Sequence, residues 1–317
     1  MRVLHYWDGR RGTPKRLQIE FIKKLSNYCI LNIYGNREDE EEFSPIRYQG
    51  NRNIQEIVDE LKSDILLIPE YAIAITINGL NTCKIPVVMM ELDWYATDSC
   101  DQDFYSKNNI NYIITKTPVS FEDQNISSVW LPFSVDDKEF YTDPNNDFLA
   151  NRKNKITFIG GGLGSSNKFY KVRTNAINLL SKTDYFDYLG CRPPNVYVDS
   201  LKKYKGALSC SFPPLRFPPA KVWEIMACGN ALLVTDFYYR NILFGNDECF
   251  FIYKEDLSNL IEKTKEIIND TDKVREYTKK AINIIQNRHL DSHRIFELYN
   301  ILKAIHEGKE IPKIWGL

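Results

Sequence analysis

Residues 218–236 read PPAKVWEIMACGNALLVTD, which is the pattern of a short helix followed by a buried strand. The two prolines suit the start of a helix, because the first turn leaves backbone N–H groups unpaired and proline has none. Gly229 can end the helix, and the apolar run ALLV after it is typical of a strand buried on both faces. Glu224 lies in the first turns of this helix, among residues suited to burial. The stretch therefore predicts one helix–strand unit of a parallel α/β domain, with a carboxylate near the helix start.

Short apolar runs separated by helical patterns recur along the whole chain. Five runs in the first half predict strands: RVLHYW (2–7), CILNIYG (29–35), DILLIPE (64–70), PVVMMELDW (86–94) and NYIITKT (111–117). Five more follow in the second half: ITFIGGG (156–162), YFDYLG (185–190), GALSCSF (206–212), NALLVTD (230–236) and ECFFIY (248–253). Alternating strands and helices favour parallel sheets. We therefore predict the α/β class, with two Rossmann-like doubly wound domains that face a central cleft.

The polar segment YTDPNNDFLANRKNK (141–155) separates the two halves. We predict an N-terminal domain over residues 1–140 and a C-terminal domain over residues 141–294. A helix and tail over residues 295–317 are predicted to pack back on the N-terminal domain. Because the carboxyl ends of the strands bind ligands in such sheets, the active site is expected between the two domains.

The composition limits the class of protein. A chain of 317 residues suits two domains, and 41 basic against 42 acidic residues give a net charge of -1, with no overall sign of a polyanionic partner. The seven cysteines include no CxxC pair, which argues against a disulfide framework or a structural zinc and favours a reducing compartment. No apolar stretch reaches the roughly 20 residues that a membrane-spanning helix needs. We expect a soluble protein of the cytoplasm.

A glycine-rich turn follows the first strand of the second half, in FIGGGLGSSNKFYKVR (158–173). Exposed backbone N–H groups and the start of the next helix suit a phosphate. Read as GxGxxG, the pattern ends at Ser165, and the following strand carries no acidic residue placed for a ribose, which weakens a nicotinamide site. The GxxxxGK of a nucleotide-triphosphatase loop is also absent, and a tight turn without a ligand remains an alternative.

The stretch KVWEIMACGNALLVTD resembles the nucleotide-sugar signature of GT-B glycosyltransferases, in particular the group-1 type and the CgeB-like branch. The resemblance extends to WLPFSVD (130–136) and to FGNDECFFIYKEDLSNLIEKTKEII (244–268), so it covers most of residues 129–300. It implies a transfer of sugar from a nucleotide diphosphate to a hydroxyl acceptor. It also implies that the C-terminal domain binds the donor and the N-terminal domain binds the acceptor.

Carried over residue by residue, the resemblance makes Glu224 the ligand of the ribose and Lys221 a contact of the diphosphate. The remaining predicted donor-site residues are Gly160, Gly161, Gly162, Gly164, Lys168, Arg173 and Arg216. Retaining members of the family have a second glutamate at the position of Arg216. An arginine cannot act as that carboxylate but can bind phosphate, so retention or inversion stays undecided. A degenerate relative that only binds nucleotide sugars, or that serves in assembly, is the alternative.

An inverting mechanism needs a general base near the acceptor. Asp93 follows a predicted strand, where a base belongs or where an aspartate caps the next turn, and Asp8 and His5 are further candidates. Arg10, Arg11 and Trp94 are predicted acceptor contacts, although the arginines also suit a solvated helix start. The acceptor is a glycan or protein of the cell envelope, or a hydroxymethylated base in viral or phage DNA.

No cofactor is expected besides the nucleotide-sugar co-substrate, a UDP- or GDP-sugar. His289 and His293 have the i, i+4 spacing of a metal pair, but no third ligand lies nearby in the sequence. We therefore predict two surface residues of one helix and no metal site, in agreement with the family, whose chemistry does not usually depend on a bound metal.

Overall fold

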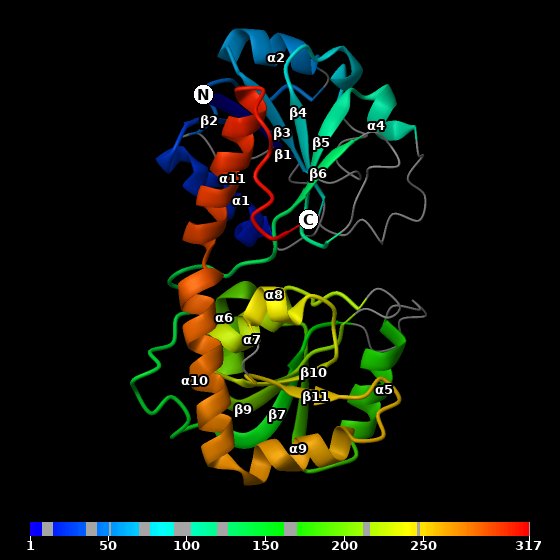
Figure 1. The fold of residues 1–317 in the computed structure, drawn as a ribbon, viewed down its shortest axis with the longest axis vertical. Helices are drawn as coiled ribbons and strands as arrows, with labels where there is room; N and C mark the ends of the chain where they lie inside the picture. Colours follow the sequence, from blue (N-terminus) through cyan, green and yellow to red (C-terminus); the bar gives the residue numbers. More distant parts are fainter. Residues whose placement is uncertain are drawn as a thin grey trace. The chain divides into compact units, whose positions relative to one another are not determined.

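The computed structural model describes residues 1–7, 15–35, 43–50, 52–69, 77–91, 103–118, 126–161, 170–211, 216–245 and 248–316. The chain divides into two compact units. The first unit comprises Met1–Pro132 with Ser292–Leu317, and the second comprises Phe133–Asp291. Each unit contains one parallel sheet with flanking helices (Figure 1), which confirms the predicted α/β class with two Rossmann-like domains. The central cleft stays a prediction.

The sheet of the first unit has six parallel strands in the order β2-β1-β3-β4-β5-β6. The strands are β1 (Arg2–Trp7), β2 (Ile30–Gly35), β3 (Ile65–Ile68), β4 (Val87–Glu91), β5 (Ile110–Thr115) and β6 (Ser127–Trp130). The helices that belong to this unit are α1 (Lys15–Lys23), α2 (Ile54–Leu61), α4 (Phe104–Lys107) and α11 (Asp291–His306), with 3-10 turns at Lys24–Asn27 and Leu80–Thr82.

Helices cover both faces of this sheet because successive side chains of a strand point to opposite faces. In β1, Leu4 and Tyr6 pack with the apolar residues of α2 and α4. Val3 and Trp7 lie in the other cluster, with residues of α1 and α11. Helix α11 supplies Ile295, Leu298, Ile301, Leu302 and Ile305 to that cluster, and Figure 1 shows it beside the first sheet. The last long helix is thus part of the core of the first unit.

The sheet of the second unit has five parallel strands in the order β11-β10-β9-β7-β8. They are β7 (Lys153–Ile159), β8 (Phe186–Gly190), β9 (Tyr204–Leu208), β10 (Ala231–Thr235) and β11 (Phe251–Tyr253). The helices are α5 (Lys171–Leu180), α6 (Pro194–Lys202), α7 (Lys221–Ala227), α8 (Arg240–Phe244), α9 (Leu260–Asn269) and α10 (Thr271–Arg288). Five of the seven residues of α7 are buried, as its sequence predicts.

The two sheets share a topological feature that determines where a ligand can bind. From β7 the chain moves to its neighbour β8 and then returns to the other side of β7 with β9. The first unit does the same with β1, β2 and β3. In sheets with such a reversal the helices before and after it lie on opposite faces, so a crevice is expected at the carboxyl ends of the two central strands. A ligand-binding site is therefore expected among the residues that follow β7 and β9.

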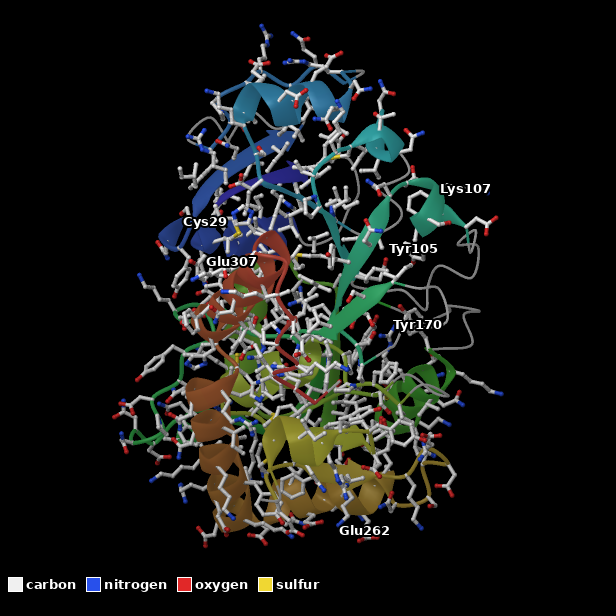
Figure 2. All side chains as sticks on the ribbon, turned by 45° about the horizontal axis from the view of Figure 1, so that its top comes forward. Cys29, Tyr105, Lys107, Tyr170, Glu262 and Glu307 are labelled. Carbon is white, nitrogen blue, oxygen red and sulfur yellow. The ribbon has the colours of Figure 1, made fainter. Side chains whose placement is uncertain are left out.

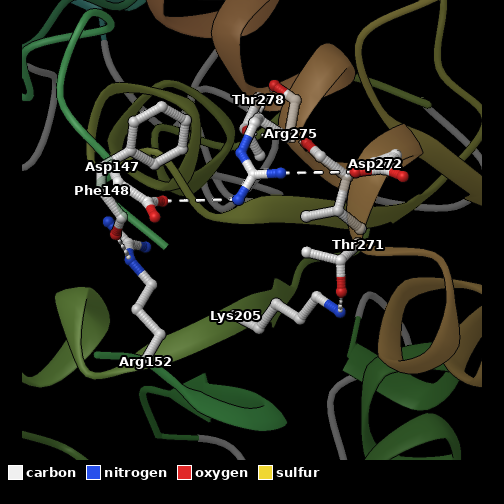
Figure 3. Close-up of polar contacts among 9 residues, drawn as sticks. Asp147, Phe148, Arg152, Lys205, Thr271, Asp272, Arg275 and Thr278 are labelled. Atoms are coloured by element: carbon white, nitrogen blue, oxygen red, sulfur yellow. Dashed lines mark hydrogen bonds and ion pairs between the residues drawn. The ribbon is translucent and has the colours of Figure 1, made fainter. Parts of the chain in front are cut away.

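Two basic residues, the partly buried Arg152 and the buried Lys205, bind the ends of helices of the second unit at the side opposite the carboxyl ends of the strands (Figure 3). Arg152 donates to the carbonyl oxygens of Phe148 at 2.6 Å, Tyr204 at 3.2 Å and Cys228 at 2.6 Å. Because Cys228 is the residue that ends α7, this contact places a positive charge at the negative end of that helix. Lys205 likewise donates to the carbonyl oxygen of Ile268, near the end of α9, at 2.9 Å. These contacts hold α7 with its first turn toward the carboxyl ends of the strands.

Candidate functional site

The glycine turn after β7 is tight and lies against the end of β8. Gly160 has φ +150°, a conformation that side-chain-bearing residues rarely adopt. Its N–H donates to the carbonyl oxygen of Gly190 at 3.0 Å, and its own carbonyl oxygen accepts from the hydroxyl of Tyr188 at 3.2 Å. A Cβ on Gly161 would lie 3.3 Å from Sγ of Cys191, an exposed residue. The other predicted members of the turn, Gly162, Gly164 and Lys168, lie outside the described residues.

Lys221 and Glu224 lie in the first turn of α7, and Tyr197 of α6 connects them. The hydroxyl of Tyr197 donates to Oε2 of Glu224 at 2.5 Å. The hydroxyl oxygen of Tyr197 also accepts from Nζ of Lys221 at 3.2 Å. Nζ of Lys221 also donates to the carbonyl oxygen of Ile159, the last residue of β7, at 2.5 Å. This contact joins the start of α7 to the strand that carries the glycine turn. Lys221, Tyr197 and Glu224 are called the α7 triad below.

The environment of the α7 triad changes the proton affinity of two of its members. Burial lowers the pKa of Lys221, and the charge of Glu224 partly offsets this effect. Burial raises the pKa of Tyr197 well above its usual value, and the neighbouring Glu224 raises it further. A tyrosine that keeps its proton at neutral pH remains a hydrogen-bond donor to the carboxylate. The triad therefore holds an ammonium group and a carboxylate in fixed positions.

Arg173 adds a second cation at the same end of the sheet. It is the third residue of α5, and its guanidinium lies 3.9 Å from the ring centre of Tyr170, the residue before this helix (labelled in Figure 2). The guanidinium also lies 5.6 Å from the ring of Phe158, and the opposing Nζ of Lys221 lies 5.4 Å from that ring. Nε of Arg173 is buried and has no hydrogen-bond partner among the described residues. A buried donor without a partner is costly, so it suits an anionic ligand.

Arg216 lies at the carboxyl edge of the same sheet in a conformation that is unusual for arginine. Its φ is +47°, a left-handed conformation that costs about 1–2 kcal/mol for a residue with a side chain. Its Nε forms an ion pair with Oε1 of Glu255, two residues after β11, at 3.1 Å. Its carbonyl oxygen accepts from the backbone N–H of Tyr238 at 2.9 Å. The structure thus pairs the predicted phosphate-binding arginine with a carboxylate.

His5, the one predicted catalytic residue that the structure describes, lies inside β1. It is two residues before the end of the strand and only 2% exposed. Its Nδ1 lies 3.2 Å from the carbonyl oxygen of Leu67, and burial lowers its pKa from 6.5 to about 4. The other predicted catalytic and acceptor residues lie outside the described ranges: Asp8, Asp93, Arg10, Arg11 and Trp94.

The prediction of two surface histidines on one helix was wrong. His289 follows the last residue of α10 and is fully buried, with Nε2 2.7 Å from the carbonyl oxygen of Leu243, whereas His293 belongs to α11. The i, i+4 spacing does not place the two histidines on one helix face, because α10 ends at Arg288 and α11 begins at Asp291. Among the described residues, no group of three His, Cys, Asp or Glu side chains is placed to hold a metal ion.

Two residues of this region were not singled out from the sequence. Tyr197 lies 27 positions before Glu224, and only the packing of α6 beside α7 brings them together. Glu255 follows a strand that the sequence predicts, but its pairing with Arg216 depends on the strand order. The sequence contains only a weak indication of Glu255: a charged residue shortly after a buried parallel strand is a candidate for a site.

Comparisons with known proteins identify the fold. Residues 167–300 match a family model described as glycosyl transferase-like. HepE of Anabaena, solved with UDP and glucose, superposes with a TM-score of 0.68 at 13% identity, covering 96% of this chain and 100% of that chain. An α-glucosyltransferase solved with UDP and a DNA 13-mer containing an HMU base gives a TM-score of 0.64 at 13% identity, covering 97% of this chain and 99% of that one. The chain has the GT-B fold.

A DNA-modifying β-glucosyltransferase is a third similar structure, with a TM-score of 0.63, 14% identity, and coverage of 97% of this chain and 100% of that chain. No curated protein matches the sequence. The predicted resemblance to GT-B glycosyltransferases is therefore confirmed, whereas the CgeB-like branch stays a prediction. Within the part of the chain that the structure describes, every helix is too short or too polar to cross a membrane.

Proposed function

We propose that this protein is a glycosyltransferase that moves a sugar from a nucleotide diphosphate to a hydroxyl acceptor. The observation that carries this proposal is the α7 triad beside Arg173, at the crevice of a GT-B donor domain. UDP is the first nucleotide to test, because similar structures contain UDP. The free thiols of Cys29, Cys83, Cys191, Cys210 and Cys228 fit the cytoplasm as the site of the reaction.

Glu224 binds the ribose in this proposal. One of its carboxylate oxygens accepts from Tyr197, which fixes the side chain and leaves Oε1 to accept from the ribose hydroxyls. Because the carboxylate is already held in place, the ribose does not have to order it on binding. Lys221 uses two of its three protons on Ile159 and Tyr197, so one proton remains for a diphosphate oxygen.

Arg173 and Lys221 stabilise the leaving diphosphate. When the bond to the sugar breaks, negative charge grows on the phosphate oxygen, and fixed cations at that position lower the barrier. Gly160 and Gly161 allow the backbone to approach the same phosphates. Arg216 is the remaining predicted contact, and its pairing with Glu255 is treated below.

The acceptor hydroxyl must lose a proton, and Asp93 is our first candidate for the base, followed by Asp8 and His5. His5 is neutral at pH 7 because its pKa lies near 4, so it has an acceptor nitrogen available, but its burial within β1 limits access by a substrate. Arg10, Arg11 and Trp94 are proposed to bind the acceptor. Retention or inversion stays open, because Arg216 replaces the expected carboxylate.

Isothermal calorimetry with UDP and with GDP tests the donor site. Replacing Glu224 with alanine should weaken binding of the preferred nucleotide about 100-fold, because two hydrogen bonds to a charged group are lost. The variant Glu224→Gln keeps the size of the side chain and should lie between the two proteins. Equal affinity in wild type and Glu224→Ala would remove Glu224 from the site.

A catalytically inactive nucleotide-sugar-binding protein is the alternative, favoured by Arg216 at the position of the expected carboxylate. Release of UDP from a panel of UDP-sugars, with and without hydroxyl acceptors, distinguishes the two. Binding without turnover of any donor would favour the alternative.

DNA is a specific candidate for the acceptor, because one similar structure is an α-glucosyltransferase in complex with DNA and another is a DNA-modifying β-glucosyltransferase. Binding of hydroxymethylated DNA should weaken steeply with salt and should be lost when Arg10 and Arg11 become alanine, since phosphate contacts release counterions. Lack of binding even at low salt would leave a glycan or a protein as the acceptor.

A further inference from the structure

Arg216 and Glu255 form an ion pair at the carboxyl edge of the second sheet, beside the proposed donor site. Both side chains are partly exposed, 44% for Arg216 and 34% for Glu255. The guanidinium also lies 5.8 Å from the ring centre of Tyr238, whose residue exposure is 52%. An arginine, a carboxylate and an aromatic ring are therefore presented together at one surface.

The backbone holds this arrangement in place. Arg216 keeps its left-handed φ of +47°, and the N–H of Tyr238 binds its carbonyl oxygen at 2.9 Å. The next residue, Tyr239, has φ +63°, so two residues with side chains adopt this uncommon conformation on the two segments that meet here. Such outliers concentrate at functional sites, because the surrounding structure has to hold them.

Electrostatics connect the pair with the proposed phosphate site. The buried thiol of Cys210, after β9, accepts or donates a hydrogen bond to the hydroxyl of Tyr253 at 2.5 Å. The charges of Arg173 and Glu255 both act on this thiol, Arg173 lowering its pKa and Glu255 raising it. Cys210 follows β9 and Tyr253 ends β11, the two strands after which Arg216 and Glu255 lie. The pair therefore lies at the same edge of the sheet as Arg173, whose guanidinium lies over Phe158 near the end of β7.

We infer that the Arg216–Glu255 pair contacts the donor sugar and selects an uncharged sugar over an acidic one. This inference rests on the proposed function. The pair offers guanidinium donors and carboxylate acceptors for hydroxyl groups, while its charges compensate each other. Arg216 alone would favour a sugar carboxylate, because the guanidinium binds a carboxylate through two parallel hydrogen bonds. Glu255 already pairs with Nε of the guanidinium and repels a second carboxylate, so it disfavours a uronic acid.

Calorimetry with UDP, UDP-glucose and UDP-glucuronate on the whole protein tests the inference. For wild type we expect tighter binding of UDP-glucose than of UDP-glucuronate. Replacing Glu255 with glutamine frees Arg216 and should change the ratio of the two affinities at least tenfold in favour of UDP-glucuronate. The affinity for UDP itself should stay within twofold, because the pair contacts the sugar and not the nucleotide.

Two further variants make the result specific. The double variant Arg216→Gln, Glu255→Gln should lose the gain in UDP-glucuronate binding, since the gain depends on the freed guanidinium. Glu276→Gln removes one carboxylate from a surface pair with Lys280 on α10 and should leave the ratio unchanged.

The outcomes separate this inference from the proposed function. If wild type binds UDP but the ratio is the same in Glu255→Gln, the pair does not contact the sugar and this inference alone fails. It also fails if Glu276→Gln changes the ratio as much, because the effect is then one of overall charge. If wild type binds no nucleotide at all, the proposed function fails and this inference fails with it.

Discussion

The two units have the same strand order but differ in the ionisable side chains that their described residues place in or beside the first strand. Counted from the first strand of each unit, both sheets follow the order 2-1-3-4-5, and the first unit adds a sixth strand. After β7 the second unit has the glycine turn, with Lys221 bound to the carbonyl oxygen of Ile159. The corresponding strand of the first unit, β1, contains His5, which is buried and neutral.

This difference teaches that topology provides a crevice, whereas the side chains around it determine what binds. In the second unit, Lys221 and Arg173 lie near the strand ends and contact the ring of Phe158, and Lys221 also donates to Tyr197, which binds Glu224. A charge is retained there because partners surround it. In β1 the ionisable side chain lies inside the sheet, where burial removes its charge. Nucleotide binding is therefore expected in the second unit.

Removing the ammonium of Lys221 should give the largest effect, about a 100-fold loss of UDP affinity for Lys221→Gln. The loss follows because a diphosphate contact and the bond to β7 disappear together. Calorimetry measures it. The control is Lys155→Gln, which removes a lysine from the other end of β7, where it binds Asp187 at 2.9 Å. A similar loss in both variants would mean that overall charge, and not the crevice, decides binding.

The burial of His5 in the first unit predicts that the stability of the folded protein depends on pH. The folded protein keeps His5 neutral, with a pKa near 4, whereas the unfolded chain has a pKa near 6.5. The unfolded state therefore binds more protons between these values, so stability is complete above pH 6.5 and falls as the pH decreases toward 4. Between pH 7 and pH 5 the loss amounts to about 2 kcal/mol.

Urea unfolding of wild type and His5→Gln at both pH values measures this loss. The variant is expected to be less stable at pH 7 but to lose about 2 kcal/mol less on acidification, since it has no imidazole to protonate. Equal losses in the two proteins would show that His5 is accessible and titrates normally. The contrast between the two strand ends would then be smaller than the structure indicates.

Tyr197 tests whether the α7 triad acts as a unit. Tyr197→Phe should lower UDP affinity about tenfold, because Glu224 and Lys221 lose their common partner while the ring is kept. The matched control is Tyr188→Phe, which removes the hydroxyl that binds the carbonyl oxygen of Gly160 and no charged group. An affinity within twofold of wild type for Tyr197→Phe would mean that Glu224 is positioned by its helix alone.

The sequence predicted the frame of the molecule better than the details of its site. The ten apolar runs quoted above each overlap one of the strands β1–β5 and β7–β11, because parallel strands buried on both faces are continuously apolar. The helix and strand around Glu224 also formed as the sequence predicts. The partners of Glu224 and Arg216 could not be predicted from the sequence, because Tyr197 and Glu255 approach them only through the packing of separate elements. Local periodicity contains no information on such long-range pairs.

Alkylation of Cys191 gives the smallest expected effect and tests the location of the site without any activity. Cys191 is exposed, and its Sγ lies beside Gly161 of the proposed donor site, so we expect bound UDP to cover it. At a UDP concentration five times Kd, its labelling rate should fall about sixfold, because only the unbound fraction reacts. Peptide mapping by mass spectrometry follows this cysteine together with Cys29 of the first unit. Cys29 is partly buried, and its rate should not change with UDP. If UDP protects Cys29 and leaves Cys191 reactive, the nucleotide binds in the first unit, and the assignment of the two units has to be reversed.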